Sequence, residues 1–181
     1  MTKQFSPWPP TLWQLLRADA VRYVHRGGWT RNLGFWIGAT HRMSEWAHQE
    51  PRAMRCYAAR LPLAGLTKLW RAITGVCILD GASFGPGLCI PRARSMLIGR
   101  VRAGENCLIS DHVTIGTNAN ANKVAFIGDG VEIGPGARIL GPVEIGDEVR
   151  VGVNAVVSHN VHPGTEVVVA AVQLCCRGKR A

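Results

Sequence analysis

A six-residue period of aliphatic residues runs through the later part of the chain and limits what it can fold into. The positions in phase are Ile127, Ile133, Ile139, Ile145, Val151 and Val157. A second, mostly smaller apolar residue follows each by four positions, at Val131, Ala137, Val143, Val149, Ala155 and Val161. An α-helix repeats about every 3.6 residues and an ordinary strand about every 2. Neither element alone therefore explains the pattern.

The period instead fits a short strand and a tight turn, repeated so that three units complete one coil. The aliphatic residue points into the shaft, and glycines that follow several of these residues accept the turn backbone. One coil cannot bury its own inner face, so successive coils stack as a solenoid. Upstream, Phe84 and Ile90 are six residues apart, as are Ala103 and Ile109, but the interval between the two pairs is irregular. The sequence predicts a parallel β-helix, and the spacing alone leaves its handedness open.

The stretch "ISDHVTIGTNANANKVAFIGDG", residues 109–130, interrupts this pattern. Ile115 and Ile127 stand twelve residues apart, so Ala121 could mark an undisturbed coil position. The alternative is a loop extruded from the shaft. We favour the loop, near 117–125, because "TNANANK" offers nothing to an apolar interior and suits exposed turns.

The first part of the chain has a helical texture. In "TLWQLLRADAVRYVHR", Leu12, Leu15, Leu16, Ala20 and Tyr23 recur at steps of three and four residues. We expect three or four helices before the composition changes near Gly75. The predicted organisation is a helical segment over 1–74, the β-helix over 75–170 and a tail over 171–181.

The net charge of +9 is concentrated in the helical segment. Residues 1–75 hold eleven Lys and Arg against three Asp and Glu, whereas residues 76–181 hold ten against nine. Such a segment suits an anionic substrate or peripheral contact with an anionic membrane face, or is simply a solvated surface. Nucleic acid is disfavoured, because no binding motif accompanies the charge.

Neither a signal peptide nor a membrane span is expected. The N-terminus has no apolar h-region, and no run approaches the roughly 18 apolar residues that a span needs. The six cysteines contain no CxxC pair, and the histidines have no metal-ligand spacing. We therefore predict a cytoplasmic protein with reduced thiols and no metal site.

At "FGPGLCIPRARSMLIG", "HVTIG" and "FIGDGVEIGPGARILGPVEIGDEVRVGVNAVVSHNVHPGT", the chain resembles the hexapeptide-repeat acyltransferases. Within them it is similar to the serine O-acetyltransferase-like branch, which includes acetyltransferases of exopolysaccharide and colanic-acid biosynthesis. The resemblance implies a left-handed parallel β-helix, a homotrimer, a site between adjacent subunits and acetyl-CoA lying along the coils. It also implies that the extruded loop reaches toward a neighbouring subunit's site.

The chain departs from this family where the usual catalytic histidines stand. The family motif similar to "IPHPxGIVIG" is "IPRARSMLIG" here, with Arg92 in the histidine's place. A second family histidine corresponds to Val124 or its neighbours. Arginine stays protonated at neutral pH and cannot act as a general base.

His112 is the remaining candidate base for deprotonating a hydroxyl. Asp111 precedes it, but neighbouring side chains on a strand face opposite ways, so it orients His112 only if the backbone bends there or across a subunit boundary. Arg92 and Lys123 are candidates for an anionic acceptor or developing charge, and Lys123 for CoA. Matching the repeat places Gly134, Gly152 and Ala155 along the CoA groove, although small residues there also suit the fold itself.

Three hypotheses follow from the sequence. The first is an acetyl-CoA-dependent O-acetyltransferase that acts on a sugar or another small hydroxyl acceptor, in exopolysaccharide biosynthesis. The second is a serine O-acetyltransferase, which the overall resemblance supports and the replaced histidines oppose. The third is a non-catalytic or repurposed trimeric hexapeptide-repeat protein. We favour an enzyme.

Overall fold

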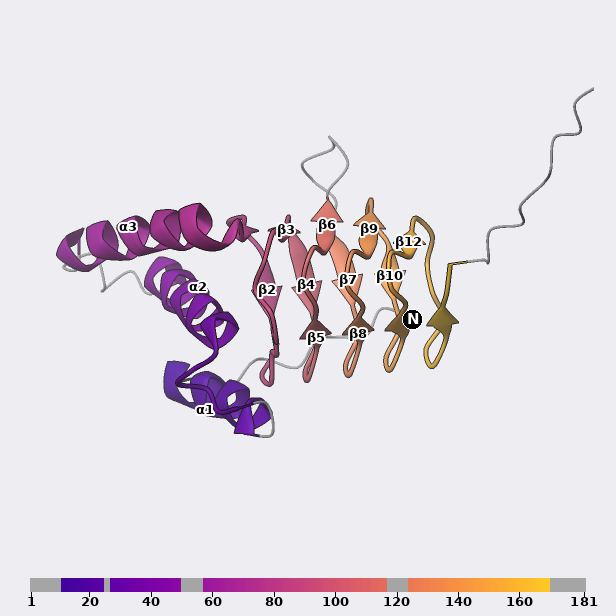
Figure 1. Cartoon of the computed structure of the whole chain (residues 1–181), viewed down its shortest axis with the longest axis horizontal. Helices are drawn as coiled ribbons and strands as arrows, with labels where there is room; N and C mark the ends of the chain where they lie inside the picture. Colours follow the sequence, from indigo (N-terminus) through magenta and orange to yellow (C-terminus); the bar gives the residue numbers. More distant parts are fainter. Residues whose placement is uncertain (1–10, 25–26, 50–56, 117–123, 170–181) are drawn as a thin grey trace, which may run out of the picture.

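Three helices precede a stack of short strands in the computed structural model, which describes residues 11–24, 27–49, 57–116 and 124–169 (Figure 1). The helices are α1 (Leu12–Arg22), α2 (Leu33–Gln49) and α3 (Tyr57–Thr74). The strands are β1 (Cys77–Ile78), β2 (Ser83–Phe84), β3 (Leu97–Ile98), β4 (Val101–Ala103), β5 (Leu108–Ile109), β6 (Thr114–Gly116), β7 (Ala125–Ile127), β8 (Glu132–Ile133), β9 (Arg138–Leu140), β10 (Glu144–Ile145), β11 (Arg150–Val151), β12 (Val156–Val157) and β13 (Glu166–Val167).

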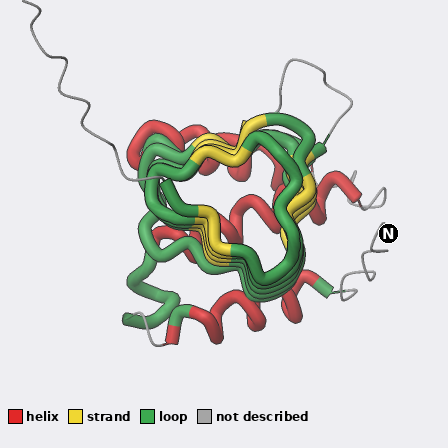
Figure 2. The backbone as a smooth tube through the Cα atoms, turned by 90° about the vertical axis from the view of Figure 1, so that its right-hand side faces the viewer, coloured by secondary structure: helices red, strands yellow, loops and turns green. Residues whose placement is uncertain are grey.

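The strands form three parallel sheets that are the three faces of one shaft (Figure 2). Face 1 holds β1, β3, β6, β9 and β12, face 2 holds β2, β4, β7 and β10, and face 3 holds β5, β8, β11 and β13. The chain passes from face 1 to face 2 to face 3 in each coil. We call the turn from face 3 to face 1 the first edge, from face 1 to face 2 the second, and from face 2 to face 3 the third. The architecture confirms the predicted left-handed parallel β-helix preceded by helices.

The periodic residues line the interior of this shaft. Ile127, Ile133 and Ile139 are fully buried, and Ile145, Val151 and Val157 are 3% exposed. Aliphatic side chains stack because each coil pairs in register with the next, as Ile133 does with Val151. Each such burial contributes roughly 1.5–3 kcal/mol. The stacking of these side chains from coil to coil therefore explains the six-residue period.

Strand pairing also measures the interruption after β6. Arg138 pairs with Val156, eighteen residues later, which is three units of six. Thr114 pairs with Arg138, which is twenty-four residues later. Ile115 lies on face 1 and Ile127 on the next face, face 2. One six-residue unit would normally separate two such residues, but twelve residues do, so the chain contains one additional unit here. Residues 117–123 themselves, including Ala121, lie outside the described part of the chain.

The helices lie at the end of the shaft where the coils begin (Figure 1). A buried ion pair between Asp19 of α1 and Arg42 of α2 joins them to the first coil, where Arg42 donates to the carbonyls of Phe84 and Gly85. The hydroxyl of Tyr23 accepts a hydrogen bond from the amide of Ile90. The helices therefore close the open apolar end that a solenoid would otherwise expose.

The helix α3 runs without a break through Pro62 and Gly65. Its packing against α2 and the first coil, through Trp70, outweighs the single hydrogen bond that a proline lacks. Within the described residues, the helices are all too short or too polar to cross a bilayer.

Candidate functional site

The first edge carries a column of residues in the left-handed backbone region. The column consists of Gly75, Ser95, His112, Gly136 and Asn154, with φ between 45° and 71°. Glycine and asparagine adopt this conformation readily, whereas other residues do so rarely. Backbone bonds hold the column, from the amide of His112 to the carbonyl of Arg94 at 2.9 Å and from that of Gly136 to the carbonyl of Asp111 at 3.0 Å. A histidine thus occupies a position that the fold gives elsewhere mostly to small residues.

The turn at His112 determines how Asp111 lies. These two residues belong to no strand, and the left-handed φ of 57° at His112 bends the chain between them. As a result the Asp111 Oδ2 and His112 Nε2 atoms are 4.0 Å apart. The condition under which Asp111 could orient His112, a bend in the backbone, is therefore met. The histidine side chain is 59% exposed, so it is open to a ligand or a neighbouring chain.

Arg92 lies on the same edge, one coil before His112, and is exposed. Arg94 and Ser95 beside it are also exposed. Sequence reasoning did not single out Arg94. The coil register would have revealed it, because Leu97 pairs with Thr114 and so places the turns that precede them side by side.

The residues matched to the CoA groove have different environments. Gly134 and Gly152 continue the first edge beyond His112. A Cβ on Gly134 would lie 2.8 Å from the carbonyl oxygen of Val151, and one on Gly152 would lie 2.9 Å from that of Val167. Stacking of the coils therefore already requires glycine at both. Ala155 is 1% exposed with its side chain in the shaft, and Lys123 lies outside the described residues.

The second edge holds a hollow beside the place where the chain leaves β6. It is lined by Gly116, Leu140, Gly141, Pro142, Val143, Ser158, His159 and Asn160. The Ser158 hydroxyl lies 2.9 Å from Nδ1 of His159. The sequence analysis did not single out His159 as a site residue. Its proximity to the interrupted coil depends on the register of β9 and β12, which the sequence pattern does not display.

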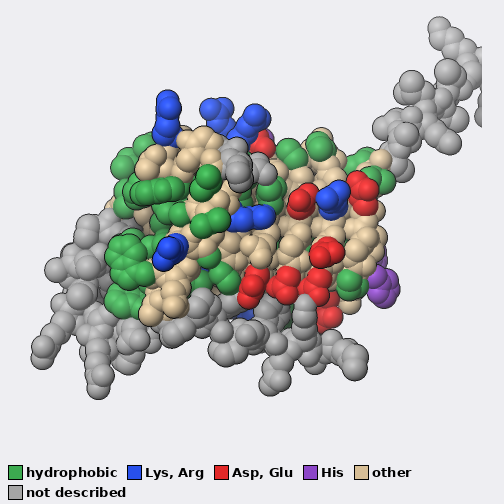
Figure 3. Space-filling view, turned by 90° about the horizontal axis from the view of Figure 1, so that it is seen from below, with side chains coloured by type: hydrophobic (Ala, Val, Ile, Leu, Met, Phe, Trp, Pro, Cys, Tyr) green, Lys and Arg blue, Asp and Glu red, His purple; other side chains and the backbone are tan. Residues whose placement is uncertain are grey.

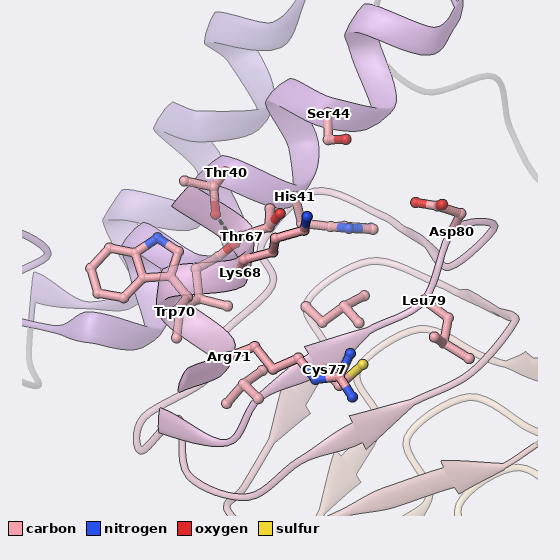
Figure 4. Close-up of a pocket in the computed structure, with 13 residues that line it drawn as sticks. Thr40, His41, Ser44, Thr67, Lys68, Trp70, Arg71, Cys77, Leu79 and Asp80 are labelled. Atoms are coloured by element: carbon pink, nitrogen blue, oxygen red, sulfur yellow. Dashed lines mark hydrogen bonds between the residues drawn. The ribbon is translucent and has the colours of Figure 1, made fainter. Parts of the chain in front are cut away.

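Another cavity, of about 240 Å³, lies between α2, α3 and the first coil (Figure 4). Lys68 and Arg71 of α3 extend along it, and His41 of α2 lies opposite them (Figure 4). Burial lowers the pKa of His41, whose Nε2 lies 2.9 Å from the carbonyl oxygen of Ala82. His41 is therefore neutral at pH 7 and acts here as a packed polar group.

The described cysteines behave as ordinary buried or half-buried thiols. Cys77, Cys89 and Cys107 form no disulfide. Burial raises the pKa of the Cys107 thiol to about 12, so it stays protonated and unreactive at neutral pH. Among the residues that the structure covers, no group of three His, Cys, Asp or Glu side chains is placed to hold a metal ion.

Comparison with known proteins agrees with this geometry. A family model described as bacterial transferase hexapeptide (six repeats) matches residues 125–159. A serine acetyltransferase of Synechococcus elongatus is 35% identical over 86 residues, which are 46% of this chain and 32% of that protein. The chain thus spans about a third of the length of this curated relative.

Solved structures extend the likeness to the helices. The serine acetyltransferase of Neisseria gonorrhoeae superposes with a TM-score of 0.75 at 26% identity, over 88% of this chain and 65% of that one. Serine acetyltransferase 1 of Entamoeba histolytica gives a TM-score of 0.73 at 23% identity, over 88% and 64%, and so shows the fold alone. Residues 125–159 thus match the hexapeptide repeat, and the chain folds as a left-handed β-helix. Its fold, helices included, is that of the serine acetyltransferases.

Proposed function

We propose that the protein is an O-acetyltransferase that moves an acetyl group from acetyl-CoA to a small hydroxyl acceptor. The observation that carries this proposal is His112, an exposed histidine in a left-handed turn with the Asp111 carboxylate beside it, on a fold shared with serine acetyltransferases. The other positions of this column carry glycine, serine or asparagine, so the histidine is the exception. A serine acetyltransferase of 24% identity has been solved in complex with CoA.

A homotrimer supplies the second half of the site. The outer side of face 1 is the most apolar one, since Leu79, Leu97, Leu140 and Val156 are 44–55% exposed there, and Arg138 is the charged residue of its strands. The outer positions of faces 2 and 3 are largely charged, as at Arg102, Glu144, Glu132 and Arg150. An apolar strip of this kind marks an interface. Three shafts that each turn face 1 inward bury it completely.

This arrangement fixes which edges meet. Face 1 is bounded by the first and second edges, so the first edge of one copy lies against the second edge of the next. His112 directly precedes β6, and the interrupted coil leaves face 1 at the end of β6. His112 of one copy therefore lies level with the site in its neighbour where the additional residues leave the shaft. The end of β6 in one copy and His112 of the next therefore border one cleft in the proposed trimer.

The chemistry follows from these groups. The His112 imidazole accepts the acceptor's hydroxyl proton as the oxygen attacks the thioester carbonyl, and it returns that proton to the departing CoA thiolate. Exposed amides and the Arg92 guanidinium stabilise the tetrahedral oxyanion. The negative charge of Asp111, whose Oδ2 lies 4.0 Å from His112 Nε2, attracts the imidazolium that forms in between. The pantetheine arm would lie along the first edge beyond His112, where Gly134 and Gly152 form the turns of successive coils.

Serine is the first candidate acceptor, because the relatives in sequence and structure are serine acetyltransferases. This reverses the order that the sequence favoured, in which a sugar came first. A carbohydrate acceptor stays the second candidate on one observation. Arg92 stands where that family carries a histidine, so serine recognition cannot be inherited unchanged.

The acceptor is tested by following release of the CoA thiol with a chromogenic thiol reagent. We expect turnover with acetyl-CoA and L-serine that exceeds turnover with any simple sugar or nucleotide sugar. Turnover confined to sugars would show that the acceptor is a carbohydrate instead. If no acceptor releases CoA and calorimetry detects no CoA binding, the protein is a non-catalytic scaffold and the proposal is wrong.

The trimer is tested with a double variant, Leu97→Asp with Leu140→Asp. Two carboxylates on face 1 cannot be buried without a large cost, so sedimentation should show single copies in place of three. Acetyl transfer should disappear with the trimer. Arg102→Asp is the control, because Arg102 is exposed on the outer side of face 2, away from face 1. A trimer that survives the double variant would show that another face forms the interface.

A further inference from the structure

The outer side of α1 is apolar although nothing in the described chain covers it. Trp13 is 80% exposed, Val21 62% and Val24 60%. Their spacing places them on one side of the helix together with the exposed Arg17. The opposite side carries the residues that pack inward, with Asp19 and Tyr23 at 3% and 1% exposure. An exposed strip of this composition is costly in water and is typical of a contact surface.

A second apolar area begins in the turn after α1 and continues onto α2. We call it the tryptophan patch, and it consists of Trp29, Leu33, Trp36 and Met43, each 40–49% exposed. The Trp29 and Trp36 ring centroids are 6.0 Å apart, and both rings pack on Phe35. The Trp36 indole donates to the carbonyl of Thr30 at 3.2 Å. Packing thus holds two large rings in place while part of each faces solvent.

The charge around these areas has one sign. The exposed cations Arg17, Arg22 and Arg31 belong to α1 and the following turn. The acids among the described helical residues are Asp19, which is buried against Arg42, and Glu45. Acidic side chains gather instead over the coils, away from the apolar end of the molecule (Figure 3). The surface is therefore apolar, aromatic and basic at the helical end, whereas acidic and basic side chains both occur along the shaft.

We propose that the helical segment docks onto a bilayer surface that contains anionic lipid, through the tryptophan patch and the outer side of α1. Tryptophan prefers the interface between headgroups and acyl chains, where an apolar ring and a polar N–H are both accommodated. Anionic headgroups attract the surrounding arginines. The shaft carries charges of both signs in nearly equal number and so offers no comparable attraction. This proposal does not depend on acetyl transfer.

The charge distribution distinguishes this occupant from a second copy of the chain. Two copies joined through these surfaces would bring arginines against arginines, which opposes association. An anionic bilayer supplies the complementary charge. In the proposed trimer all three helical segments lie at the same end of the shaft. Three weak contacts can then engage one membrane, and together they bind more tightly than any one alone.

Vesicle sedimentation tests the proposal with the full chain. We expect the protein to pellet with vesicles of equimolar phosphatidylcholine and phosphatidylglycerol, and to stay in solution with phosphatidylcholine alone. Salt should weaken binding, because screening shortens the reach of the arginines. Tryptophan emission should shift to shorter wavelength when the anionic vesicles are added.

Paired variants locate the contact. Arg17→Glu should weaken partitioning by about fivefold or more, whereas Arg102→Glu on face 2 should leave it unchanged. Trp13→Ser combined with Trp36→Ser should weaken it by about tenfold or more, and Val168→Ser should have no effect. Unchanged circular dichroism would show that the variants are folded. If the double variant does not fold, the single variant Trp13→Ser tests the same contact and should also weaken partitioning.

Two outcomes would overturn this inference. One is the absence of binding to either kind of vesicle. The other is a tryptophan variant that changes the association state in sedimentation velocity while vesicle binding stays the same, because the surface would then join copies of the chain.

Discussion

Replacing His112 by asparagine or glycine should lower kcat for acetyl transfer by about 10²–10⁴-fold, the usual contribution of a general base. Both replacements suit the left-handed backbone at this position, where φ is 57°. The melting temperature should therefore stay close to that of the unmodified protein. Steady-state kinetics with acetyl-CoA and the best acceptor, together with a thermal melt, measure the two quantities.

The backbone requirement supplies the controls for this experiment. His112→Ala should lose the same activity with little change in stability, because histidine and alanine carry the same Cβ strain in the left-handed region. Asn106→Gly changes a left-handed residue on the third edge, far from the proposed cleft, and should leave kcat unchanged. If His112→Asn retains full activity, then another group removes the proton and the site proposed on the first edge is wrong.

The sequence pattern predicts the shaft well because a single physical requirement generates both. Coils that stack in register must place an aliphatic residue inside the shaft at every sixth position. The periodic residues from Ile127 to Val157 therefore predict the fold directly. Handedness does not follow from the period and came from the resemblance. The extra unit between Ile115 and Ile127 was also ambiguous, since twelve is a multiple of six. Only the pairing of Thr114 with Arg138 separates an inserted unit from a regular one.

It was harder to predict from the sequence which residues are neighbours on the first edge. The early coils are irregular, with Cys77 pairing to Leu97 after twenty residues and Leu97 to Thr114 after seventeen. These slips hide that Arg94 lies directly beside His112. The position of Asp111 relative to His112 could not be predicted from the sequence either. The left-handed turn that places the two side chains 4.0 Å apart is not marked by a glycine or asparagine. A histidine there follows no turn preference.

The buried ion pair escaped prediction for a different reason. Asp19 and Arg42 are twenty-three residues apart on two amphipathic helices, and each in isolation looks like a solvated charge. Asp19 accepts from Nε of Arg42 at 2.6 Å and from the amides of Gly87 and Leu88 at 2.9 Å. Arg42 is 2% exposed. Six hydrogen bonds through this pair join α1, α2 and the first coil.

Replacing Arg42 by methionine should therefore cost about 3–5 kcal/mol in the free energy of unfolding, because it leaves the Asp19 charge buried without a partner. It also leaves the carbonyls of Phe84 and Gly85 without their donor. The matched control is Arg150→Met, whose partner Glu132 is 3.6 Å away with both side chains more than half exposed. This second change should cost less than about 1 kcal/mol. Urea denaturation of the two variants gives both values.

Hydrogen exchange then shows which part of the molecule opens in Arg42→Met. Because the pair fastens the helices to the coil rather than the coils to one another, protection should fall in α1 and α2 while β8 to β12 keep theirs. The double variant Asp19→Asn with Arg42→Met removes the unpaired charge as well, so it should recover part of the loss and give a clear coupling energy in a double-mutant cycle. Equal costs for Arg42→Met and Arg150→Met would mean that the helices are held by apolar packing alone. A uniform loss of protection through all coils would mean instead that helices and shaft unfold as one cooperative unit.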